Sequence, residues 1–322
     1  MRTSGWMLGI VLGALAAGPG SATEPARVAA VATGAVTGAY FPAAVALCRV
    51  VNVERRETGL RCAALPSEGS VANLRDLRAG AVDLALAQSD TVAAAEAGTG
   101  AFAEAGPDEG LRAVMALFPE PLALVARGDA GVKGLADLPG KRVGVGTAGS
   151  GQRALVGALM DRLGWKPTAF AEFSELAPEA AANALCEGRL DAFFYAVGQP
   201  AQVVRGAVES CGATLADVAG PEVEAVVAAD PALAVVTIPA GTYAGLDRDV
   251  ATFGPVATLV TRADASEGDI RLLTAAVLDA LPDLGGLDSL LGGLDPAAMA
   301  RRGLTAPLHP GAAAAFRDHG AD

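Results

Sequence analysis

Short apolar runs alternate along this chain with segments whose apolar residues recur at the helical period. In the first half, these runs predict strands at 28–31, 60–65, 83–87, 112–117 and 122–126. Pro42 is expected at the first position of one intervening helix, and Ser70 is expected to cap another. Strands that alternate with helices predict a parallel α/β sheet, and such sheets bind ligands at the carboxyl ends of their strands.

The same alternation starts again in the second half of the chain. Apolar runs predict strands at 142–145, 190–196, 234–238 and 256–260, and apolar periodicity predicts helices at 152–163 and from Glu267 onward. Pro200 is expected in the first turn of a further helix. Because the chain has 322 residues, this second set of elements is enough for a second domain.

Three polar loops, 33–40, 67–73 and 88–90, each follow a predicted strand. We expect them to lie together at one edge of the sheet. The first loop is rich in Thr and Gly and leads into a helix, so its backbone N–H groups suit an anionic or carboxylate ligand. The alternative is an ordinary strand–helix turn in which Tyr40 and Phe41 pack in the core.

A fourth glycine-rich loop follows the strand at 142–145. Its glycines Gly144, Gly146 and Gly149 satisfy the GxGxxG pattern of dinucleotide sites. No acidic residue is clearly placed at the end of a following strand, so this alternative is weak. The favoured interpretation is a helix start that receives an anion, with Thr147 and Ser150 as hydroxyl donors. Arg153 in the first turn either adds positive charge there or is a solvated surface residue.

The first 22 residues have the pattern of a cleavable signal peptide. Arg2 provides a positive charge, residues 6–17 are apolar, and small residues precede a cleavage site after Ala22. The apolar segment is shorter than the ~20 residues of a membrane span. An uncleaved membrane anchor is the alternative, but we expect an exported protein.

The overall composition excludes several classes of function. The net charge of −12 argues against binding to nucleic acid or to anionic membranes, and 52% hydrophobic residues argue against disorder. The four cysteines, Cys48, Cys62, Cys186 and Cys211, predict two disulfides in an exported protein. Pairing each cysteine with its neighbour in sequence is the simplest of three connectivities. Without a CxxC motif and with only two histidines, a zinc site or a Cys/His nucleophile is disfavoured.

Seven motifs in order make the chain resemble a known family. They are TGAVTGAYFP at 33–42, GSVANLRDLRAG at 69–80, DLALAQSD at 83–90, DLPGKRVGVGTAGSGQ at 137–152, DAFFYAVGQP at 191–200, IPAGTYAG at 238–245 and PLHPGA at 307–312. The chain resembles the TAXI-type solute-binding proteins of tripartite ATP-independent periplasmic (TRAP) transporters. The placement of the cysteines resembles a subgroup of that family.

The resemblance implies an α/β fold with two lobes, the periplasmic-binding-protein fold of a type II-like kind, with the ligand in the cleft between the lobes. It divides the chain into a signal peptide (1–22), a first part of lobe 1 (23–119), lobe 2 (120–235), and a return crossing with the rest of lobe 1 (236–322). The crossings are expected near 119–122 and 234–256.

The implied function is that of a monomeric periplasmic receptor. It would bind a small carboxylate, such as glutamate, glutamine or 2-oxoglutarate, by lobe closure and deliver it to the membrane subunits of a TRAP transporter, with no catalysis, cofactor or metal. One alternative is a sensory receptor that reports the ligand to a membrane kinase. Another is an enzyme on a similar fold, which the lack of a well-formed Ser/His/Asp or Cys/His set disfavours.

The resemblance also implies a set of ligand contacts. By matching motif these are Thr33, Gly34, Thr37, Tyr40, Ser70, Gln88, Ser89, Thr147, Ser150, Gly151, Gly198 and Tyr243, with Ala196 nearby. Two stretches depart from the family pattern, because Thr91 and residues 230–233 stand where aromatic residues are usual. The pocket is therefore expected to be wider or less aromatic, and the identity of the ligand stays open.

Overall fold

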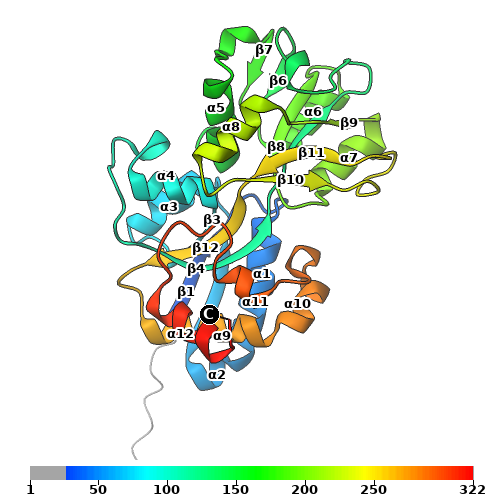
Figure 1. Cartoon of the computed structure of the whole chain (residues 1–322). Helices are drawn as coiled ribbons and strands as arrows, with labels where there is room; N and C mark the ends of the chain where they lie inside the picture. The colour runs from blue at the N-terminus through cyan, green and yellow to red at the C-terminus, as the bar shows by residue number, and fades with distance from the viewer. Residues whose placement is uncertain (1–26, 322) are drawn as a thin grey trace, which may run out of the picture.

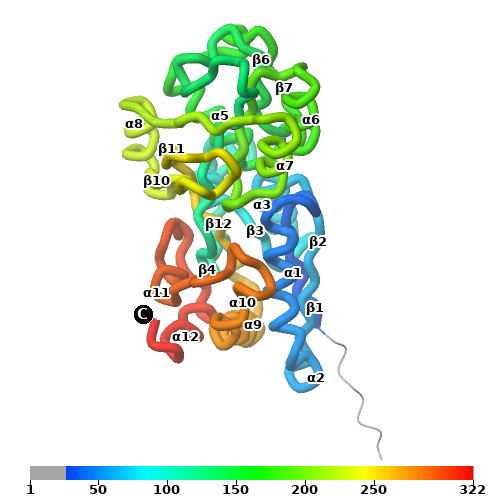
Figure 2. Tube along the Cα trace, turned by 90° about the vertical axis from the view of Figure 1, so that its right-hand side faces the viewer, coloured from blue at the N-terminus to red at the C-terminus, as the bar shows by residue number. Residues whose placement is uncertain are grey.

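The strands form two five-stranded sheets, one in each lobe, and a two-stranded ribbon. The computed structural model describes residues 27–321, and the expected signal peptide lies outside them. The two lobes are stacked one above the other, and the chain's last helices return to the lobe that holds its first strands (Figures 1 and 2).

The first lobe surrounds a sheet of order β2-β1-β3-β12-β4. Its strands are β1 (Arg27–Ala32), β2 (Leu60–Leu65), β3 (Leu84–Gln88), β4 (Leu111–Pro119) and β12 (Val256–Arg262), and its helices are α1 (Tyr40–Val51), α2 (Arg55–Thr58), α3 (Ser70–Arg78), α4 (Ser89–Ala97), α9 (Glu267–Asp279), α10 (Leu281–Leu287), α11 (Pro296–Met299) and α12 (Pro310–Asp318). Every residue of β3 is buried, as expected for a strand covered on both faces.

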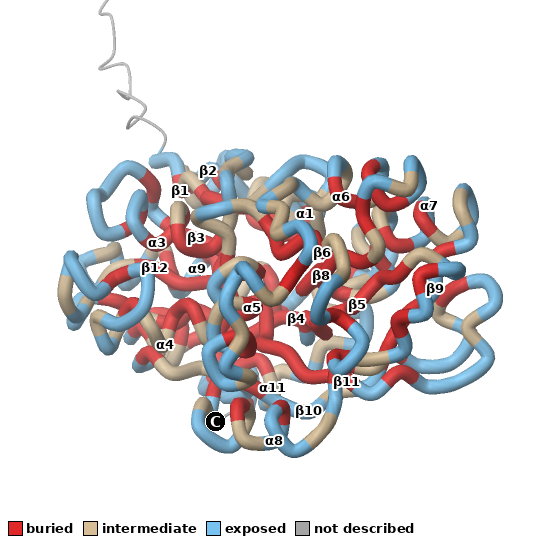
Figure 3. The backbone as a smooth tube through the Cα atoms, turned by 90° about the horizontal axis from the view of Figure 1, so that it is seen from above, coloured by how far each residue is buried: buried red, intermediate tan, exposed pale blue. Residues whose placement is uncertain are grey.

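The second lobe surrounds a sheet of order β7-β6-β8-β5-β9. Its elements are β5 (Leu122–Ala126), β6 (Arg142–Gly144), β7 (Glu172–Ser174), β8 (Ala192–Ala196), β9 (Thr214–Ala216), α5 (Gly151–Arg162), α6 (Pro178–Cys186), α7 (Gln202–Cys211) and α8 (Pro221–Ala229), with the ribbon strands β10 (Ala234–Ile238) and β11 (Val250–Gly254). Seen from above, the buried segments follow the strands, and exposed segments surround them (Figure 3).

Both sheets are mixed, so the expectation of parallel sheets is wrong in part. Strand β1 runs parallel to β2 and β3, but β12 runs antiparallel to β3 and β4. In the second lobe, β5 is antiparallel to β8 and β9. The strands β5 and β12 each enter their sheet from the other lobe. They therefore run against the strands whose carboxyl ends face the cleft.

Two short segments connect the lobes. The chain leaves the first sheet after Pro119 and returns to it at Val256, and the Glu120 N–H donates to the Pro255 carbonyl at 2.9 Å. A Cβ atom on Gly254 would lie 2.1 Å from the Glu120 carbonyl oxygen, so the crossings can approach this closely only because Gly254 lacks one.

The ribbon packs with the second lobe. Phe253 belongs to one apolar cluster of that lobe, and Ile238 and Val250 belong to another. The expected lobe boundaries at 119/120 and 235/236 remain a proposal. The strand positions support the first boundary, and the ribbon's packing favours a return near Gly254.

Three expected helix starts are wrong. Helix α1 begins at Tyr40 rather than Pro42. Pro42 still lies in the first turn, where an N–H group would have no acceptor within the helix, so proline costs no hydrogen bond there. Gly69 is the N-cap residue of α3, and the Ser70 hydroxyl instead accepts a hydrogen bond from the Gln88 N–H. Pro200 precedes α7, which begins at Gln202.

Two disulfides connect neighbouring elements. Cys48–Cys62 joins α1 to β2, and Cys186–Cys211 joins α6 to α7. This is the pairing of sequence neighbours. Between residues 27 and 321, we find no helix with the length and apolar character needed to cross a bilayer.

Candidate ligand-binding site

A cavity of about 510 Å³ lies between the lobes. Both lobes and the first crossing contribute to its wall. The lining residues are Gly34, Ala35, Gly38, Ala39, Tyr40, Ser67, Glu68, Gly69, Ser70, Gln88, Glu120, Thr147, Ala148, Ser150, Gly151, Gln152, Ala177, Pro178, Tyr195, Ala196 and Val197. A volume of this size is within the range of pockets for small molecules.

The first-lobe wall consists of the segments that follow β1, β2 and β3. The Ser70 hydroxyl accepts from the Gln88 N–H at 3.0 Å and so joins the start of α3 to the end of β3. Asn73, which is fully buried, donates to the carbonyls of Thr33 and Leu86 and accepts from the Ser67 hydroxyl. These bonds hold the three expected polar loops together at the sheet edge.

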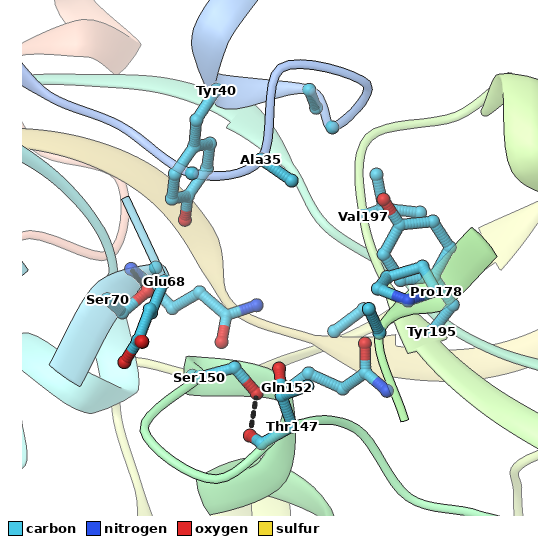
Figure 4. Close-up of a pocket in the computed structure, with 18 of the residues that line it drawn as sticks. Ala35, Tyr40, Glu68, Ser70, Thr147, Ser150, Gln152, Pro178, Tyr195 and Val197 are labelled. Carbon is cyan, nitrogen blue, oxygen red and sulfur yellow. Dashed lines mark hydrogen bonds between the residues drawn. The ribbon is translucent and has the colours of Figure 1, made fainter. Parts of the chain in front are cut away.

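The second-lobe wall consists of the glycine-rich loop before α5 and the end of β8. Ser150 is the N-cap of α5 and accepts from the Arg153 N–H at 3.1 Å, while its hydroxyl donates to the Thr147 carbonyl at 2.7 Å. The Gln152 amide donates to the Phe194 carbonyl at 2.6 Å and so fixes the helix start against β8. Figure 4 shows Tyr40 and Tyr195 on opposite sides of the cavity.

The lobes touch across the cleft. A Cβ atom on Gly151 would lie 2.1 Å from the Gln88 Oε1 and 2.7 Å from the Ser70 Oγ, both in the opposite lobe. The Thr37 hydroxyl donates to the Glu179 carboxylate, and the Ser89 hydroxyl donates to the Ala232 carbonyl at 2.8 Å. The structure therefore shows the closed arrangement of the lobes.

Four helices begin at the cavity. Helices α1, α3 and α5 start with Tyr40, Ser70 and Gly151, which line it, and α6 starts with Pro178, which also lines it. The first N–H groups of a helix have no partner within the helix and carry partial positive charge. Together they give the cavity several donors for an anionic group.

Glu120, on the first crossing, is a buried acid in this cavity. The residue is 3% exposed, and its carboxyl group accepts a hydrogen bond from the Tyr40 hydroxyl at 2.7 Å. Burial raises the pKa of Glu120 to about 8; the Tyr40 bond opposes this shift, and the charge of Asp90 adds to it. Burial, with Glu120 nearby, also raises the pKa of Tyr40 well above its usual value.

Burial also shifts the pKa of two further groups near the cavity. It raises the pKa of Asp90 to about 7, against a hydrogen bond from the Thr91 N–H and with a contribution from Asp230. It raises the pKa of Tyr195 above its ordinary range, and Glu179 and Glu120 add to this shift. The neutral forms of these acids are therefore favoured at the cleft.

The cavity brings together seven of the twelve residues expected as ligand contacts. They are Gly34, Tyr40, Ser70, Gln88, Thr147, Ser150 and Gly151. They come from both lobes, from segments up to 117 positions apart in sequence, between Gly34 and Gly151. Whether they touch a ligand stays a prediction.

The other five expected contacts lie outside this cavity. The Thr33 hydroxyl donates to the Leu65 carbonyl, and Ser89 bonds to Ala232 and to the Val256 N–H. Thr37 and Gly198 line a neighbouring hollow of about 470 Å³. The Tyr243 hydroxyl accepts from the Ala201 N–H at 2.7 Å within the second lobe, and a third hollow lies beside this residue.

Five polar lining residues were not among the expected contacts. They are Ser67, Glu68, Glu120, Gln152 and Tyr195. Glu120 carries a signal that could have been used, since it is the one acid in an apolar stretch from 113 to 126 and lies between Pro119 and Pro121. Arg153, by contrast, is not in the lining, because it pairs with Glu175 at 2.6 Å and lies over the Phe173 ring.

No group of three or more His, Cys, Asp or Glu side chains in residues 27–321 is arranged to hold a metal ion. The cavity's polar groups are hydroxyls, amides, two acids and helix N–H groups. Such groups hold a small polar molecule by hydrogen bonds.

Three solved structures are among those that this chain resembles. MatC from Rhodopseudomonas palustris with bound malate shares 21% identity at a TM-score of 0.54, over 84% of this chain and 91% of that chain. A protein described as an L-cystine ABC transporter from Listeria monocytogenes shares 17% sequence identity at a TM-score of 0.51. The match covers 83% of this chain and 97% of that chain. The periplasmic aliphatic sulphonate binding protein SsuA from Escherichia coli shares 16% sequence identity at a TM-score of 0.49. The match covers 91% of this chain and 83% of that chain.

The first two of these likenesses show the fold, which is the two-lobed α/β fold of periplasmic binding proteins expected from the sequence. The sequence itself matches the NMT1-like family over residues 31–320, a match that includes both lobes and every residue of the cavity lining. The chain therefore belongs to the NMT1-like family.

Proposed function

We propose that this protein is an extracytoplasmic solute receptor that binds a small carboxylate between its lobes. The observation that carries the proposal is the closed inter-lobe cavity, at which helices from both lobes begin. A carboxylate there would accept hydrogen bonds from helix N–H groups and from the hydroxyls of Ser70, Thr147 and Ser150.

Binding would act by shifting the balance between open and closed lobes. The ligand gains contacts with both walls only when Gly151 approaches Gln88 and Ser70, so it stabilises the closed form. A micromolar dissociation constant corresponds to ~8 kcal/mol, which is within reach of several charge-assisted hydrogen bonds in a closed pocket. No bond in the ligand is made or broken.

The partner we propose is the membrane part of a TRAP transporter, as in the TAXI-type receptors that the seven motifs resemble. The chain would be a monomeric periplasmic protein that presents its closed, loaded form to that partner. Small carboxylates are the proposed cargo, and the malate held by MatC is one example of such a ligand on this fold.

A thermal-melt panel on ligand-stripped mature protein tests the proposal. The panel contains glutamate, glutamine, 2-oxoglutarate, C4-dicarboxylates, aromatic acids, nucleotides and simple sugars. A ligand at a hundred times its dissociation constant stabilises the fold by ~2.7 kcal/mol, which raises the melting temperature by several degrees. A shift with a small carboxylate supports the proposal. A shift with only a nucleotide or a sugar contradicts it.

A further inference from the structure

Among the described residues, the lining of the cavity contains acidic side chains and no basic ones. Its two ionisable acids are Glu68 and Glu120, and its lining contains no Lys, Arg or His among residues 27–321. The nearest candidate from the sequence, Arg153, is paired with Glu175. Sites for a plain dicarboxylate commonly use a paired arginine. This cavity instead offers helix N–H groups that can bind an anionic group of the ligand. Its carboxyl groups can bind a hydrogen-bond donor of the ligand.

Glu120 has no cationic partner in the part of the chain that the structure describes. The Tyr40 hydroxyl bonds to its Oε2 at 2.7 Å, and no ion pair of residues 27–321 includes it. A carboxylate that is 3% exposed is strongly disfavoured unless it is paired. Because Glu120 lines the cavity, the ligand is the group placed to pair with it.

A second buried acceptor lies in the same wall. Gln88 is 3% exposed, lines the cavity, and its Oε1 has no hydrogen-bond partner. This oxygen is covered by the start of α5, because a Cβ atom on Gly151 would lie 2.1 Å from it. An unpaired buried acceptor costs ~1–3 kcal/mol, so this wall has no surplus of donors for the carboxyl of Glu120. An ammonium group has three N–H donors and no acceptor, so it suits an ionised carboxyl group at Glu120.

We propose that the ligand carries a protonated amine at Glu120, so the cavity selects amino acids over oxo acids and dicarboxylic acids of the same length. The proposal rests on the proposed function, because the ligand's carboxylate accepts hydrogen bonds from the helix N–H groups while its ammonium group pairs with Glu120. Among the expected cargoes, glutamine and glutamate fit this arrangement, and 2-oxoglutarate lacks the amine.

The pH dependence of binding distinguishes the two kinds of ligand. Burial raises the pKa of Glu120 to about 8. Hydrogen bonds from Tyr40 and Gln88 lower this pKa, and the charge of Asp90 raises it. Tyr195 also interacts with Glu120, and Glu68 lines the same cavity. An ammonium ligand binds the ionised carboxylate and releases a proton, so its affinity rises from pH 6 to pH 8, by up to about tenfold per unit. A ligand that needs the protonated carboxyl loses affinity as the pH rises through 8.

Calorimetric titration of the ligand-stripped mature protein tests the proposal, with L-glutamine, L-glutamate and 2-oxoglutarate at pH 6, 7 and 8. We expect the amino acid that binds more tightly of the two to bind about ten- to hundredfold more tightly than 2-oxoglutarate. A hydrogen bond between charged groups contributes a difference of this size. Its affinity should rise with pH. Glu120→Gln, of the same shape, should lose the preference and the pH dependence.

The matched control is Glu224→Gln, an exposed acid on α8, which should bind as the wild type does. A thermal melt of each variant checks that it folds. The proposal is overturned if 2-oxoglutarate binds as tightly as both amino acids, or if Glu120→Gln keeps the wild-type affinity for them. Tight binding of 2-oxoglutarate alone would overturn it and leave the receptor proposal standing.

Discussion

At the scale of single residues, the proposed recognition of an amine depends on the buried contact between Glu120 and Tyr40. Burial favours the protonated carboxyl, and the hydrogen bond from Tyr40 favours the ionised one. The motif predicted Tyr40 as a ligand contact, and Tyr40 lines the cavity. The sequence did not place Glu120, because the apolar strands on both sides of the acid predict only that it is buried.

Tyr40→Phe removes the hydrogen bond that lowers the pKa of Glu120. That pKa should therefore rise further above 8, and the rise in amino-acid affinity with pH should move to higher pH. Calorimetric titration across pH 6 to 9 measures the midpoint of this rise. An unchanged midpoint would show that the Tyr40 bond does not control the ionisation of Glu120.

Asp191 is a residue whose charge stabilises the fold. It accepts two hydrogen bonds from the Arg142 guanidinium and one from the Arg142 N–H, and Arg142 lowers its pKa to about 2. Because the pKa is lower in the folded state, the ionised Asp191 stabilises the fold at pH values above its unfolded-state pKa of about 4. This stabilisation is lost as the pH falls toward 2.

Asp191→Asn should therefore lower the free energy of unfolding at pH 7 by ~1–2 kcal/mol, allowing for solvent around Arg142. The difference from the wild type should shrink between pH 5 and pH 2. Urea unfolding at each pH measures it. The control is Asp264→Asn, whose exposed pair with Arg262 should contribute less than ~0.5 kcal/mol. A difference that stays constant with pH would contradict this account.

At the scale of elements, the strands could be predicted more reliably than the helix starts. The apolar runs predicted β2, β5 and β10 with the bounds that the structure has. The start of α3 could not be predicted in the same way, because the Ser70 hydroxyl bonds to Gln88 rather than to its own helix. Local sequence determines where a strand is buried, whereas tertiary contacts determine what a capping side chain does.

The start of α5 offers a test of closure at this scale. Gly151→Ala places a Cβ atom against Gln88 and Ser70, so the lobes should no longer close fully, and the affinity for the ligand should fall by about tenfold or more. Gly206→Ala in α7 is the control, because nothing lies within 4 Å of its new Cβ atom. Gly206→Ala gains helix propensity inside α7, and Gly151 is the first residue of α5, so neither variant should lose stability without ligand.

Titration of the two variants with the same ligand separates the effect of the new Cβ atom in the cleft from the general effect of replacing a helical glycine by alanine. Equal affinities for Gly151→Ala, Gly206→Ala and the wild type would show that the contact between Gly151 and the first lobe is not needed for binding.

At the scale of the whole molecule, the motif series predicted the two-lobed fold, and the comparisons confirm it. The lobe boundaries stay a prediction. The motif series did not predict which of the motif residues would share a cavity. Thr33 and Ser89 belong to the same motifs as Gly34 and Gln88, but their hydroxyls bond to nearby carbonyls and take no part in the lining. That division depends on how the two lobes meet, which is a property of the closed structure and not of any one segment.

The radius of gyration in solution tests the central claim, that a small carboxylate closes the lobes. Small-angle X-ray scattering on ligand-stripped mature protein would be recorded alone and with a saturating concentration of the carboxylate that gives the largest melting shift. The account predicts a smaller radius with the ligand and no such change for Gly151→Ala. A radius that stays the same in the wild type, although the ligand is bound, would contradict it.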